Sequence, residues 1–254
     1  DFTQAALDDP AVLRLARKVR PVLDAELERD FGRQVSPAVL SVAMRDGAVH
    51  RVRKDHPCGN EREIDTAFEA AMAATAPDVV INLIAATNVD DCEKNMRYAA
   101  LLNCFVPQTI GKLVRVLQNH RPVHFIQISS DQVYNGSGPH HENITDPVNV
   151  YALTKLVGEY PALECGGCVL RTNFFGKSLV ANRKSFTDWL SDCALKGEPI
   201  QVFEDVLFSP LSITTLCQAI LLAIDARLGG LFNLGSVSQG ISKAEMASLF
   251  LKRI

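Results

Sequence analysis

The sequence of 254 residues lacks the features of several specialised protein classes. Its apolar runs, such as residues 79–86, stop far short of the roughly 18 residues that a membrane-spanning helix needs. Its 26 basic and 29 acidic residues leave a net charge of −3, and so no basic surface for nucleic acid or an anionic membrane. Residues 1–10 are acidic and polar, unlike a signal peptide, and seven cysteines without framework spacing predict reduced thiols. We therefore expect a soluble, cytoplasmic protein that binds neither nucleic acid nor a membrane.

A glycine-rich dinucleotide turn is also missing. The 15 glycines include no Gly-x-Gly-x-x-Gly or Gly-x-x-Gly-x-x-Gly spacing, and the three that precede residue 64 lie near no apolar strand. Such a turn lets the backbone approach a pyrophosphate at the N-terminus of a helix. Our hypothesis is that the diphosphate part of any dinucleotide site is incomplete in this chain.

Charge is distributed unevenly along the sequence. Of residues 1–62, 21 are charged, against 34 of the remaining 192. The first stretch predicts a small α+β segment, with a helix at residues 11–19 and two strands around a turn at Asp46-Gly47, the second strand at residues 48–54. A break follows at residues 56–60. The sequence therefore predicts two parts, residues 1–62 and residues 63–254.

Residues 63–254 alternate between helical patterns and buried strands. Because strands that alternate with helices join by right-handed crossovers, this pattern predicts an α/β fold with a doubly wound, parallel, Rossmann-like sheet. Helices are predicted at residues 64–76, 92–119 with an irregularity at Pro107, 150–163, 186–196 and 242–252, and buried strands at residues 78–86, 123–129 and 168–171.

Tyr151 and Lys155 lie four residues apart at the start of a predicted helix, so they share one helical face. A phenol near pKa 10 is a poor acid or base at neutral pH, and a nearby ammonium would lower that value. Ser130, at the end of the preceding strand, could hydrogen-bond the same carbonyl oxygen. These three residues are the predicted catalytic group, which would polarise a ketone for hydride attack. The alternative is a tyrosine and lysine pair on the surface of a helix.

These residues belong to a larger set of motifs. Residues 63–254 resemble the extended short-chain dehydrogenase/reductase superfamily, and most closely its dTDP-4-dehydrorhamnose reductase group. The matching segments are 77–82 (PDVVIN), 85–90 (AATNVD), 129–134 (SSDQVY), 147–155 (PVNVYALTK), 170–172 (LRT) and 230–235 (GLFNLG), with Glu93, Asn103 and Pro107.

The resemblance implies a role for each matching residue. Tyr151 would be the general acid, Ser130 its hydroxyl partner, and Lys155 a contact of the nicotinamide ribose in an NAD(P)H site. The same resemblance places Ala85, Ala86 and Asn103 along the cofactor, and Asp131, Gln132 and Asn149 on the substrate side. It implies no metal.

The chain departs from this superfamily upstream of residue 63. The usual first strand and its glycine-rich turn are not found there, and residue 152 is alanine where the group usually has glycine. Residues 5–61 instead resemble part of the MmgE/PrpD family, which includes 2-methylcitrate dehydratase, and carry its short His56-Pro57-x-Gly59 motif. A fusion, a truncation and a composite with missing segments all fit this juxtaposition.

The sequence therefore predicts an NAD(P)H-dependent reductase of a nucleotide-linked 4-keto-6-deoxy sugar that could form a homodimer. The alternatives are a sugar-nucleotide epimerase, a non-catalytic regulatory or binding subunit with the same fold, and an MmgE/PrpD-type hydro-lyase. Two further motifs predict no site. Cys165-Gly-Gly-Cys168 supplies half of the ligands that zinc needs, and residues 140–142 (HHE) lie in a polar loop.

Overall fold

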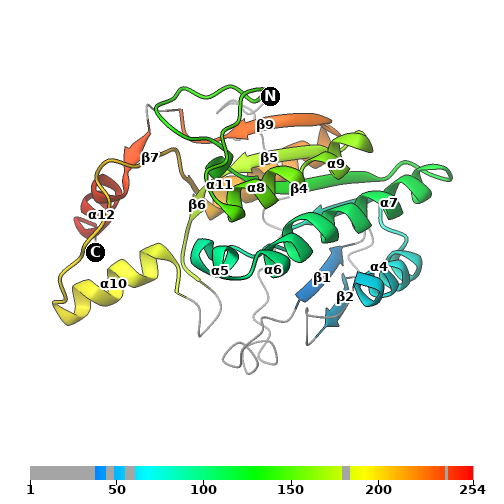
Figure 1. The fold of residues 1–254 in the computed structure, drawn as a ribbon, viewed down its shortest axis with the longest axis horizontal. Coiled ribbons are helices and arrows are strands. Elements are labelled where there is room, and N and C mark those ends of the chain that lie inside the picture. The colour runs from blue at the N-terminus through cyan, green and yellow to red at the C-terminus, as the bar shows by residue number, and fades with distance from the viewer. Residues whose placement is uncertain (1–37, 44–48, 55–60, 179–183, 238–239, 254) are drawn as a thin grey trace. The chain divides into compact units, whose positions relative to one another are not determined.

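The computed structural model describes residues 38–43, 49–54, 61–178, 184–237 and 240–253 (Figure 1). The chain divides into two compact units. Within the described residues, the sheet unit comprises residues 38–171 and 223–233, and the second unit comprises residues 172–222 and 234–253. The predicted helix at residues 11–19 and the break at residues 56–60 lie outside the described residues. No helix of the described part is long and apolar enough to cross a membrane.

Four strands form the sheet of the sheet unit, in the order β3-β4-β5-β9. They are β3 (Val79–Asn82), β4 (His124–Ser130), β5 (Cys168–Thr172) and β9 (Gly230–Leu234). β3 and β4 pair in parallel, with Asn82 opposite Gln127. The predicted α/β fold with a parallel sheet is confirmed, while the absence of its usual first strand stays a prediction.

β3 is shorter than predicted, because its last side chain turns the backbone out of the sheet. The Asn82 amide donates to Gln127 Oε1 on β4 at 2.8 Å, and its oxygen accepts from the backbone N–H of Ile84 at 3.1 Å. A side-chain oxygen that bonds two residues ahead offers the backbone an alternative to the ladder. Residues 83–86 therefore leave the strand as an irregular segment.

The predicted helix at residues 92–119 is divided into four pieces. These are α5 (Val89–Lys94), α6 (Met96–Ala100), a π-helical turn (Leu101–Phe105) and α7 (Val106–Gln118). Pro107 has no N–H to donate. The N–H of Val106, just before it, donates to the carbonyl oxygen of Leu101, five residues back, as in a π-helix. The irregularity predicted at Pro107 thus occupies the turn before it.

The predicted helix at residues 150–163 is also divided, into α8 (Val150–Val157) and α9 (Tyr160–Glu164). Gly158 lies at the corner between them, where an added Cβ would come within 2.0 Å of the carbonyl oxygen of Asn103. Only glycine permits that approach. α7, α8 and α9 all contact β4, on the side of the sheet that faces the viewer in Figure 1.

The core of the sheet unit lies between the sheet and its helices, including α4 (Glu61–Thr75). Every residue of β4 and β5 is buried, as the continuous apolar runs predicted for strands covered on both faces. The largest core side chains include Ile64, Phe68, Met72, Val80, Ile110, Val114, Phe125 and Val169.

The two strands predicted around Asp46-Gly47 are confirmed. β1 (Ala38–Ala43) and β2 (Val49–Lys54) form a separate antiparallel pair with Ala43 opposite Val49. The division of the chain at residue 62 stays a prediction.

The second unit combines short strands with three helices. β6 (Phe174–Phe175) pairs in parallel with β8 (Leu211–Ser212), and β7 (Leu207–Phe208) pairs antiparallel with β10 (Ile241–Ser242). α10 (Phe186–Lys196) packs against α12 (Lys243–Leu251), and most of α11 (Ile213–Asp225) belongs to the same unit. The Lys243 ammonium lies 3.9 Å from the ring centre of Phe208 and 4.9 Å from that of Phe186.

The first residue of β4 is a buried histidine. Nε2 of His124 lies 2.8 Å from the carbonyl oxygen of Leu228, just before β9, and Nδ1 is buried with no hydrogen-bond partner among the described residues. Burial lowers the pKa of His124. The fold therefore favours the neutral ring, so His124 contributes stability above its unfolded pKa that is lost as the pH falls.

We expect the free energy of unfolding to fall between about pH 7.5 and about pH 5.5, on either side of the ordinary histidine pKa. Urea unfolding of the wild type and of His124→Gln at both values measures this, because glutamine keeps a donor for Leu228 but does not titrate. The pH dependence should be weaker in His124→Gln, whereas His120→Gln, at an exposed position, should behave as the wild type. Equal pH dependence in the wild type and His124→Gln would contradict this account.

Candidate active site

Ser130 and Tyr151 meet at the carboxyl end of β4. Ser130 is the last residue of β4, and Tyr151 is the second residue of α8, which packs against that strand. Their side chains lie close enough for the Ser130 hydroxyl to lower the pKa of the phenol. The Ser130 hydroxyl oxygen also accepts from the backbone N–H of Gln132 at 3.1 Å, which fixes it at the start of the 3₁₀ turn Asp131–Val133.

Burial raises the pKa of the Tyr151 phenol, against the opposing effect of the Ser130 hydroxyl, and the Asp131 and Cys92 groups raise it further. The spacing of Tyr151 and Lys155 predicted that the Lys155 ammonium would lower this pKa. Lys155 is not among the groups that act on it, because its amine turns instead to the backbone of β4. The phenol therefore keeps its proton at neutral pH and is available as a donor.

Lys155 is the one charged residue of α8, and it is buried. Its Nζ donates to the carbonyl oxygen of Ile128 at 2.7 Å. Burial lowers the pKa of Lys155 to about 8, although Glu159 and Cys104 both raise it. At pH 7 the amine is therefore mostly charged, and it loses that charge at mildly alkaline pH.

Asn103 connects the irregular segment after β3 to α8. Its side-chain oxygen accepts from the N–H of Ala86 at 2.8 Å, and its Nδ2 donates to the carbonyl oxygen of Ala86 at 3.1 Å and to Thr154 Oγ1 at 3.0 Å. Ala86 is buried and Ala85 half-buried. The roles predicted for the three residues towards a cofactor stay predictions.

Three residues were predicted on the substrate side. Asp131 and Gln132 follow Ser130 directly, the first half-buried and the second exposed. The Asn149 side chain caps α8 by accepting from the N–H of Ala152 at 2.7 Å. That capping bond gives Asn149 a structural role, and its predicted contact with substrate stays a prediction, as do those of Asp131 and Gln132.

A second side chain at the start of α8 was not assigned a role from the sequence. Glu93 Oε1 accepts from the N–H of Val150 at 2.7 Å, so a carboxylate from α5 satisfies another free donor of α8. Negative charge at a helix N-terminus is stabilising. Glu93 and Asn149 together fix the turn that carries Tyr151.

A buried ion pair beside this site was not predicted from the sequence. Both oxygens of Glu159 bind Arg171 of β5, through Nε at 2.8 Å and Nη2 at 2.6 Å, and Oε1 also accepts from Ser129 Oγ at 2.5 Å. Each of the two charged side chains is 2% exposed. Breaking a buried pair by removing one partner typically costs about 3–5 kcal/mol. The spacing of Tyr151, Lys155 and Glu159, four residues apart each time, could have pointed to Glu159.

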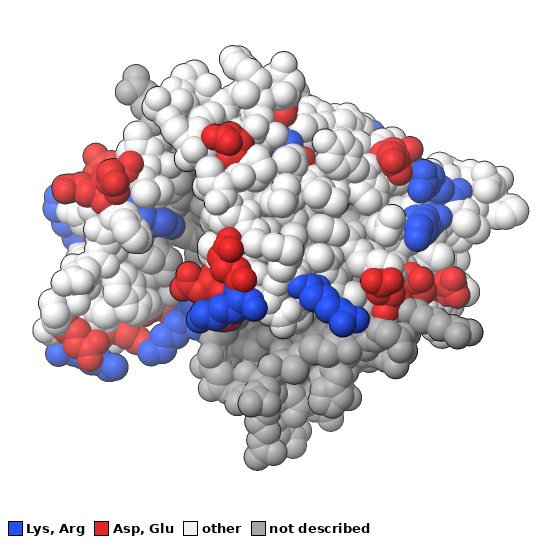
Figure 2. All heavy atoms as spheres, viewed as in Figure 1, with Lys and Arg blue, Asp and Glu red and all other residues white. Residues whose placement is uncertain are grey.

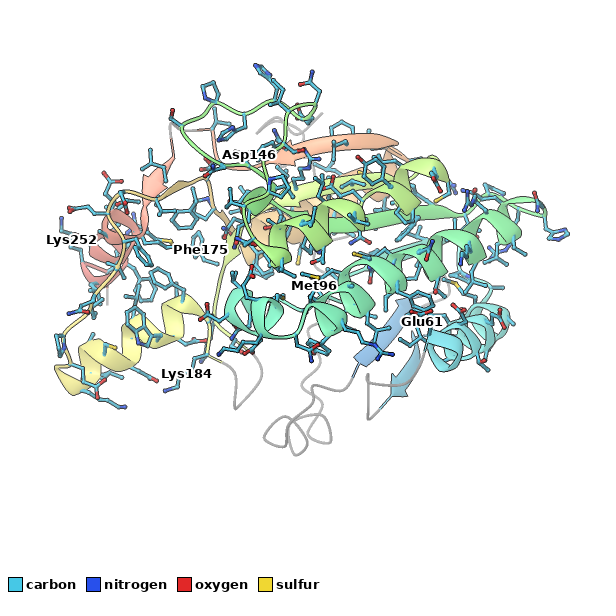
Figure 3. The ribbon with its side chains drawn as sticks, viewed as in Figure 1. Glu61, Met96, Asp146, Phe175, Lys184 and Lys252 are labelled. Carbon is cyan, nitrogen blue, oxygen red and sulfur yellow. The ribbon has the colours of Figure 1, made fainter. Side chains whose placement is uncertain are left out.

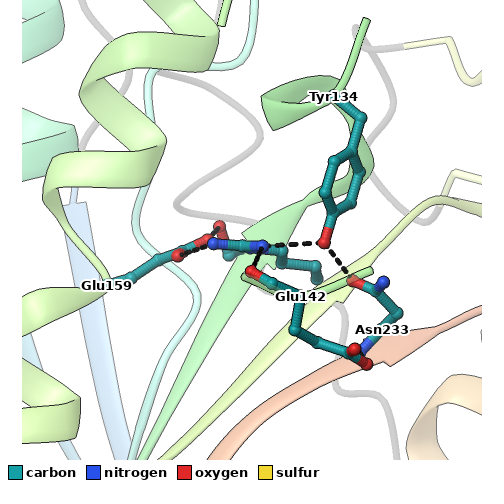
Figure 4. Close-up of polar contacts among 6 residues, drawn as sticks. Tyr134, Glu142, Glu159 and Asn233 are labelled. Atoms are coloured by element: carbon teal, nitrogen blue, oxygen red, sulfur yellow. Dashed lines mark hydrogen bonds and ion pairs between the residues drawn. The ribbon is translucent and has the colours of Figure 1, made fainter. Parts of the chain in front are cut away.

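The guanidinium of Arg171 also binds the polar loop that contains residues 140–142 (Figure 4). Its Nη1 donates to Tyr134 Oη at 2.7 Å and to the carbonyl oxygen of Glu142 at 2.9 Å. Tyr134 donates in turn to Asn233 of β9 at 2.5 Å, and the Asn233 N–H donates to Glu142 Oε1 at 3.0 Å, which lowers the pKa of Glu142. The predicted polar loop is thus fixed to β5 and β9 by named contacts.

Neither motif that was set aside forms a metal site in the described part of the chain. No group of three or more histidine, cysteine, aspartate or glutamate side chains gathers there in a way that could hold a metal ion. His140 stacks on Tyr134 with ring centres 4.8 Å apart, and Cys165 and Cys168 are buried free thiols.

Comparison with known proteins identifies the family of this chain. The family model described as RmlD substrate binding domain matches residues 34–254. The chain is 31% identical over 172 residues to a dTDP-4-dehydrorhamnose reductase of Escherichia coli, covering 62% of this chain and 54% of that protein. It is 29% identical over 168 residues to a probable low-salt glycan biosynthesis reductase of Haloferax volcanii, covering 63% and 55%. The chain thus spans about half the length of the curated relatives it matches.

Solved structures share the fold. A hypothetical dTDP-4-dehydrorhamnose reductase from Sulfolobus tokodaii superposes with a TM-score of 0.66 at 27% identity, covering 75% of this chain and 67% of that one. The Bacillus anthracis dTDP-4-dehydrorhamnose reductase in complex with NADP gives a TM-score of 0.66 at 22% identity, covering 76% and 67%, a likeness of fold alone. Since the family model covers most of the sequence, the chain belongs to the RmlD substrate binding domain family.

Proposed function

We propose that this protein takes part in the NAD(P)H-dependent reduction of a nucleotide-linked 4-keto-6-deoxy sugar, in the cytoplasm. The observation that carries the proposal is that Ser130, the last residue of β4, and the buried, protonated Tyr151 of α8 lie close enough for the serine hydroxyl to act on the phenol. Ligands of open α/β sheets bind outside the carboxyl ends of the strands. Membership of the RmlD family and similarity to dTDP-4-dehydrorhamnose reductases support the substrate class.

The residues of this chain would each have a distinct task. Tyr151 donates its proton to the carbonyl oxygen of the substrate, and Ser130 hydrogen-bonds the same oxygen as charge develops on it. Lys155 supplies a buried positive charge one helical turn beyond Tyr151. Asp131, Gln132 and Asn149 border the substrate.

The chain's residues fit the nicotinamide half of a dinucleotide. Ala85 and Ala86 present small side chains at the end of β3, Asn103 holds that segment, and Tyr151 and Lys155 face the sheet edge from α8. A nicotinamide cofactor bound there would supply the hydride.

Replacing Tyr151 with phenylalanine tests the acid. We expect nucleotide-sugar-dependent oxidation of NAD(P)H to fall by about 10²–10⁴-fold, the usual contribution of a positioned acid. Absorbance of the reduced cofactor measures the rate, with circular dichroism to show that the variant folds. Tyr160→Phe, at an exposed position on α9, is the matched control and should keep its rate. Activity that survives in Tyr151→Phe would refute the assigned acid.

The affinity for NADH and NADPH tests the hypothesis that the diphosphate site is incomplete without a glycine-rich turn. Because the sequence has no Gly-x-Gly-x-x-Gly, we expect the chain to bind NADH and NADPH more weakly than micromolar. Calorimetric titration of the chain with each cofactor measures this. Micromolar binding would show that other backbone groups hold the diphosphate.

The missing turn also supports a second candidate, a non-catalytic binding or regulatory subunit with the same fold. That candidate predicts nucleotide-sugar or cofactor binding without turnover in the wild type. Turnover of a nucleotide sugar without net oxidation of the cofactor would instead indicate an epimerase.

A second copy of this chain is the proposed protein partner. A groove of about 800 Å³ lies along α6, α7, α8 and α9, lined by Tyr98, Leu101 and Phe105 among others. Apolar side chains along and beside the groove are exposed, with Tyr160 at 59% and Met96 at 61%. Figure 3 labels Met96 on the helices in front of the sheet. Figure 2 shows a largely uncharged surface over α8, with charged side chains at its margins.

The margins of this groove suit a symmetric partner. Basic and acidic residues both line it: Arg97, Lys112 and Glu61, together with Arg115 and Glu164, which pair with each other within one copy. In a two-fold interface the same patch faces itself, so the basic groups of one copy can meet the acidic groups of the other.

We expect a dimer in sedimentation equilibrium that Met96→Glu dissociates, since the substitution buries an unpaired charge in the interface. Leu195→Glu is the control, because Leu195 is 86% exposed on α10 outside the groove, and it should stay dimeric. A wild-type monomer, or a dimer unchanged by Met96→Glu, would contradict the proposal.

A further inference from the structure

Glu159 connects the charged group of the candidate site to the strand end that carries Ser130. We propose that Glu159 is a positioning residue, which keeps the Lys155 amine charged and holds the Ser129–Ser130 strand end in place through a single buried carboxylate. This inference rests on the proposed function for its meaning in catalysis. Its test below does not use substrate or cofactor.

The position of Glu159 follows from the corner between α8 and α9. α8 ends at Val157, and Gly158 lets the chain pass against the carbonyl oxygen of Asn103, where a Cβ would come within 2.0 Å. Glu159 then precedes α9 and its carboxylate meets both β4 and β5. The corner therefore brings a charge from the helix layer into the buried sheet.

The carboxylate of Glu159 accepts three hydrogen bonds from two residues. Ser129 donates to Oε1 at 2.5 Å, and Arg171 binds both oxygens in a two-pronged geometry at 2.8 and 2.6 Å. Such charge-assisted pairs are both stronger and more directional than neutral hydrogen bonds. Ser129 immediately precedes Ser130, so this bond also fixes the backbone from which Ser130 projects.

Arg171 cannot easily move away from Glu159, because its Nη1 binds two other acceptors. Figure 4 shows Glu159 on one side of the guanidinium, and Tyr134 and Glu142 on the other. Nη1 binds Tyr134 Oη at 2.7 Å and the carbonyl oxygen of Glu142 at 2.9 Å. The negative charge of Glu159 is consequently preorganised rather than formed when a ligand arrives.

The Lys155 amine and the Glu159 carboxylate bind neighbouring residues of β4, the carbonyl oxygen of Ile128 and the hydroxyl of Ser129, so both charges lie at the same buried stretch of strand. The other surroundings of the amine supply little negative charge. The elements packed against α8 are α5, α6, the π-helical turn, β4 and the 3₁₀ turn after β4. Their titratable groups include Cys92, Glu93, Arg97, Cys104 and Asp131. Of these, Cys104 raises the pKa of Lys155. β4 contributes the carbonyl oxygen of Ile128, which accepts a hydrogen bond from the amine. The Cys104 thiol is itself protonated, since burial raises its pKa to about 11. Glu159 is thus the main ionised partner of the amine.

The direct measurement is the titration of Lys155, followed by NMR in protein labelled with ¹³C at lysine Cε and assigned by loss of the signal in Lys155→Arg. In the wild type we expect a midpoint near pH 8, where the pKa of Lys155 lies. In Glu159→Gln the midpoint should fall by about 1 pH unit or more, as expected when an opposite charge is removed from a buried site. An unchanged midpoint would overturn the proposal.

Three variants separate the charge of Glu159 from a purely structural role. Glu159→Asp keeps the charge and should hold the midpoint near that of the wild type. Ser129→Ala removes a hydrogen bond but no charge, and should leave the midpoint unchanged. Glu164→Gln removes an exposed carboxylate from α9, where it pairs with Arg115 at 3.3 Å, and should also have no effect. If the Lys155 midpoint falls as far in Glu164→Gln as in Glu159→Gln, the special role of Glu159 is refuted.

If Glu159→Gln fails to fold, the double variant Glu159→Gln/Arg171→Gln keeps the test decisive. It removes both charges of the buried pair, which proteins tolerate better than removal of one. Arg171 is not among the groups that act on Lys155, so the midpoint should still fall. The titration needs no turnover, and it therefore stands or fails independently of the Tyr151→Phe result that tests the proposed function.

Discussion

The buried carboxylate of Glu159 is the constraint on which the carboxyl edge of the sheet depends. A buried charge is tolerated only when it is paired and fully hydrogen-bonded. Its partners come from β4, through Ser129, and from β5, through Arg171. Because Arg171 extends the same network to Tyr134 and to Asn233 of β9, one carboxylate determines the relative positions of three strands and a loop.

A neutral side chain performs the equivalent task beside β3. Asn103 binds both backbone groups of Ala86 and the hydroxyl of Thr154, so it joins the end of β3 to α8. α8 is thereby held at its start by Glu93 and Asn149 and in its middle by Asn103. Preorganisation of this kind lets an active site stabilise charge without rearranging during the reaction.

Burial acts in opposite directions on the two titratable residues of α8. It raises the pKa of the Tyr151 phenol and lowers that of the Lys155 amine, because burial disfavours the charged form of each. Ser130 opposes the first effect and Glu159 the second. The result is a protonated phenol and a charged amine on one helix. The relatives of this chain include reductases of nucleotide-linked sugars.

Local patterns in the sequence were sufficient for the α/β fold, the buried strands, the start of α8 and the candidates Ser130, Tyr151 and Lys155. Those features depend on periodicity and on short spacings, which are visible along the chain. The break at Gly158 was not, because it arises from a close approach between Gly158 and Asn103, which lie far apart in sequence. Tertiary structure alone also decided the partner of Lys155. The spacing of four residues along a helix suggested Tyr151 as that partner, but the charge that acts on the amine is that of Glu159. The fold turns the amine towards β4 and brings the Glu159 carboxylate into the same buried region.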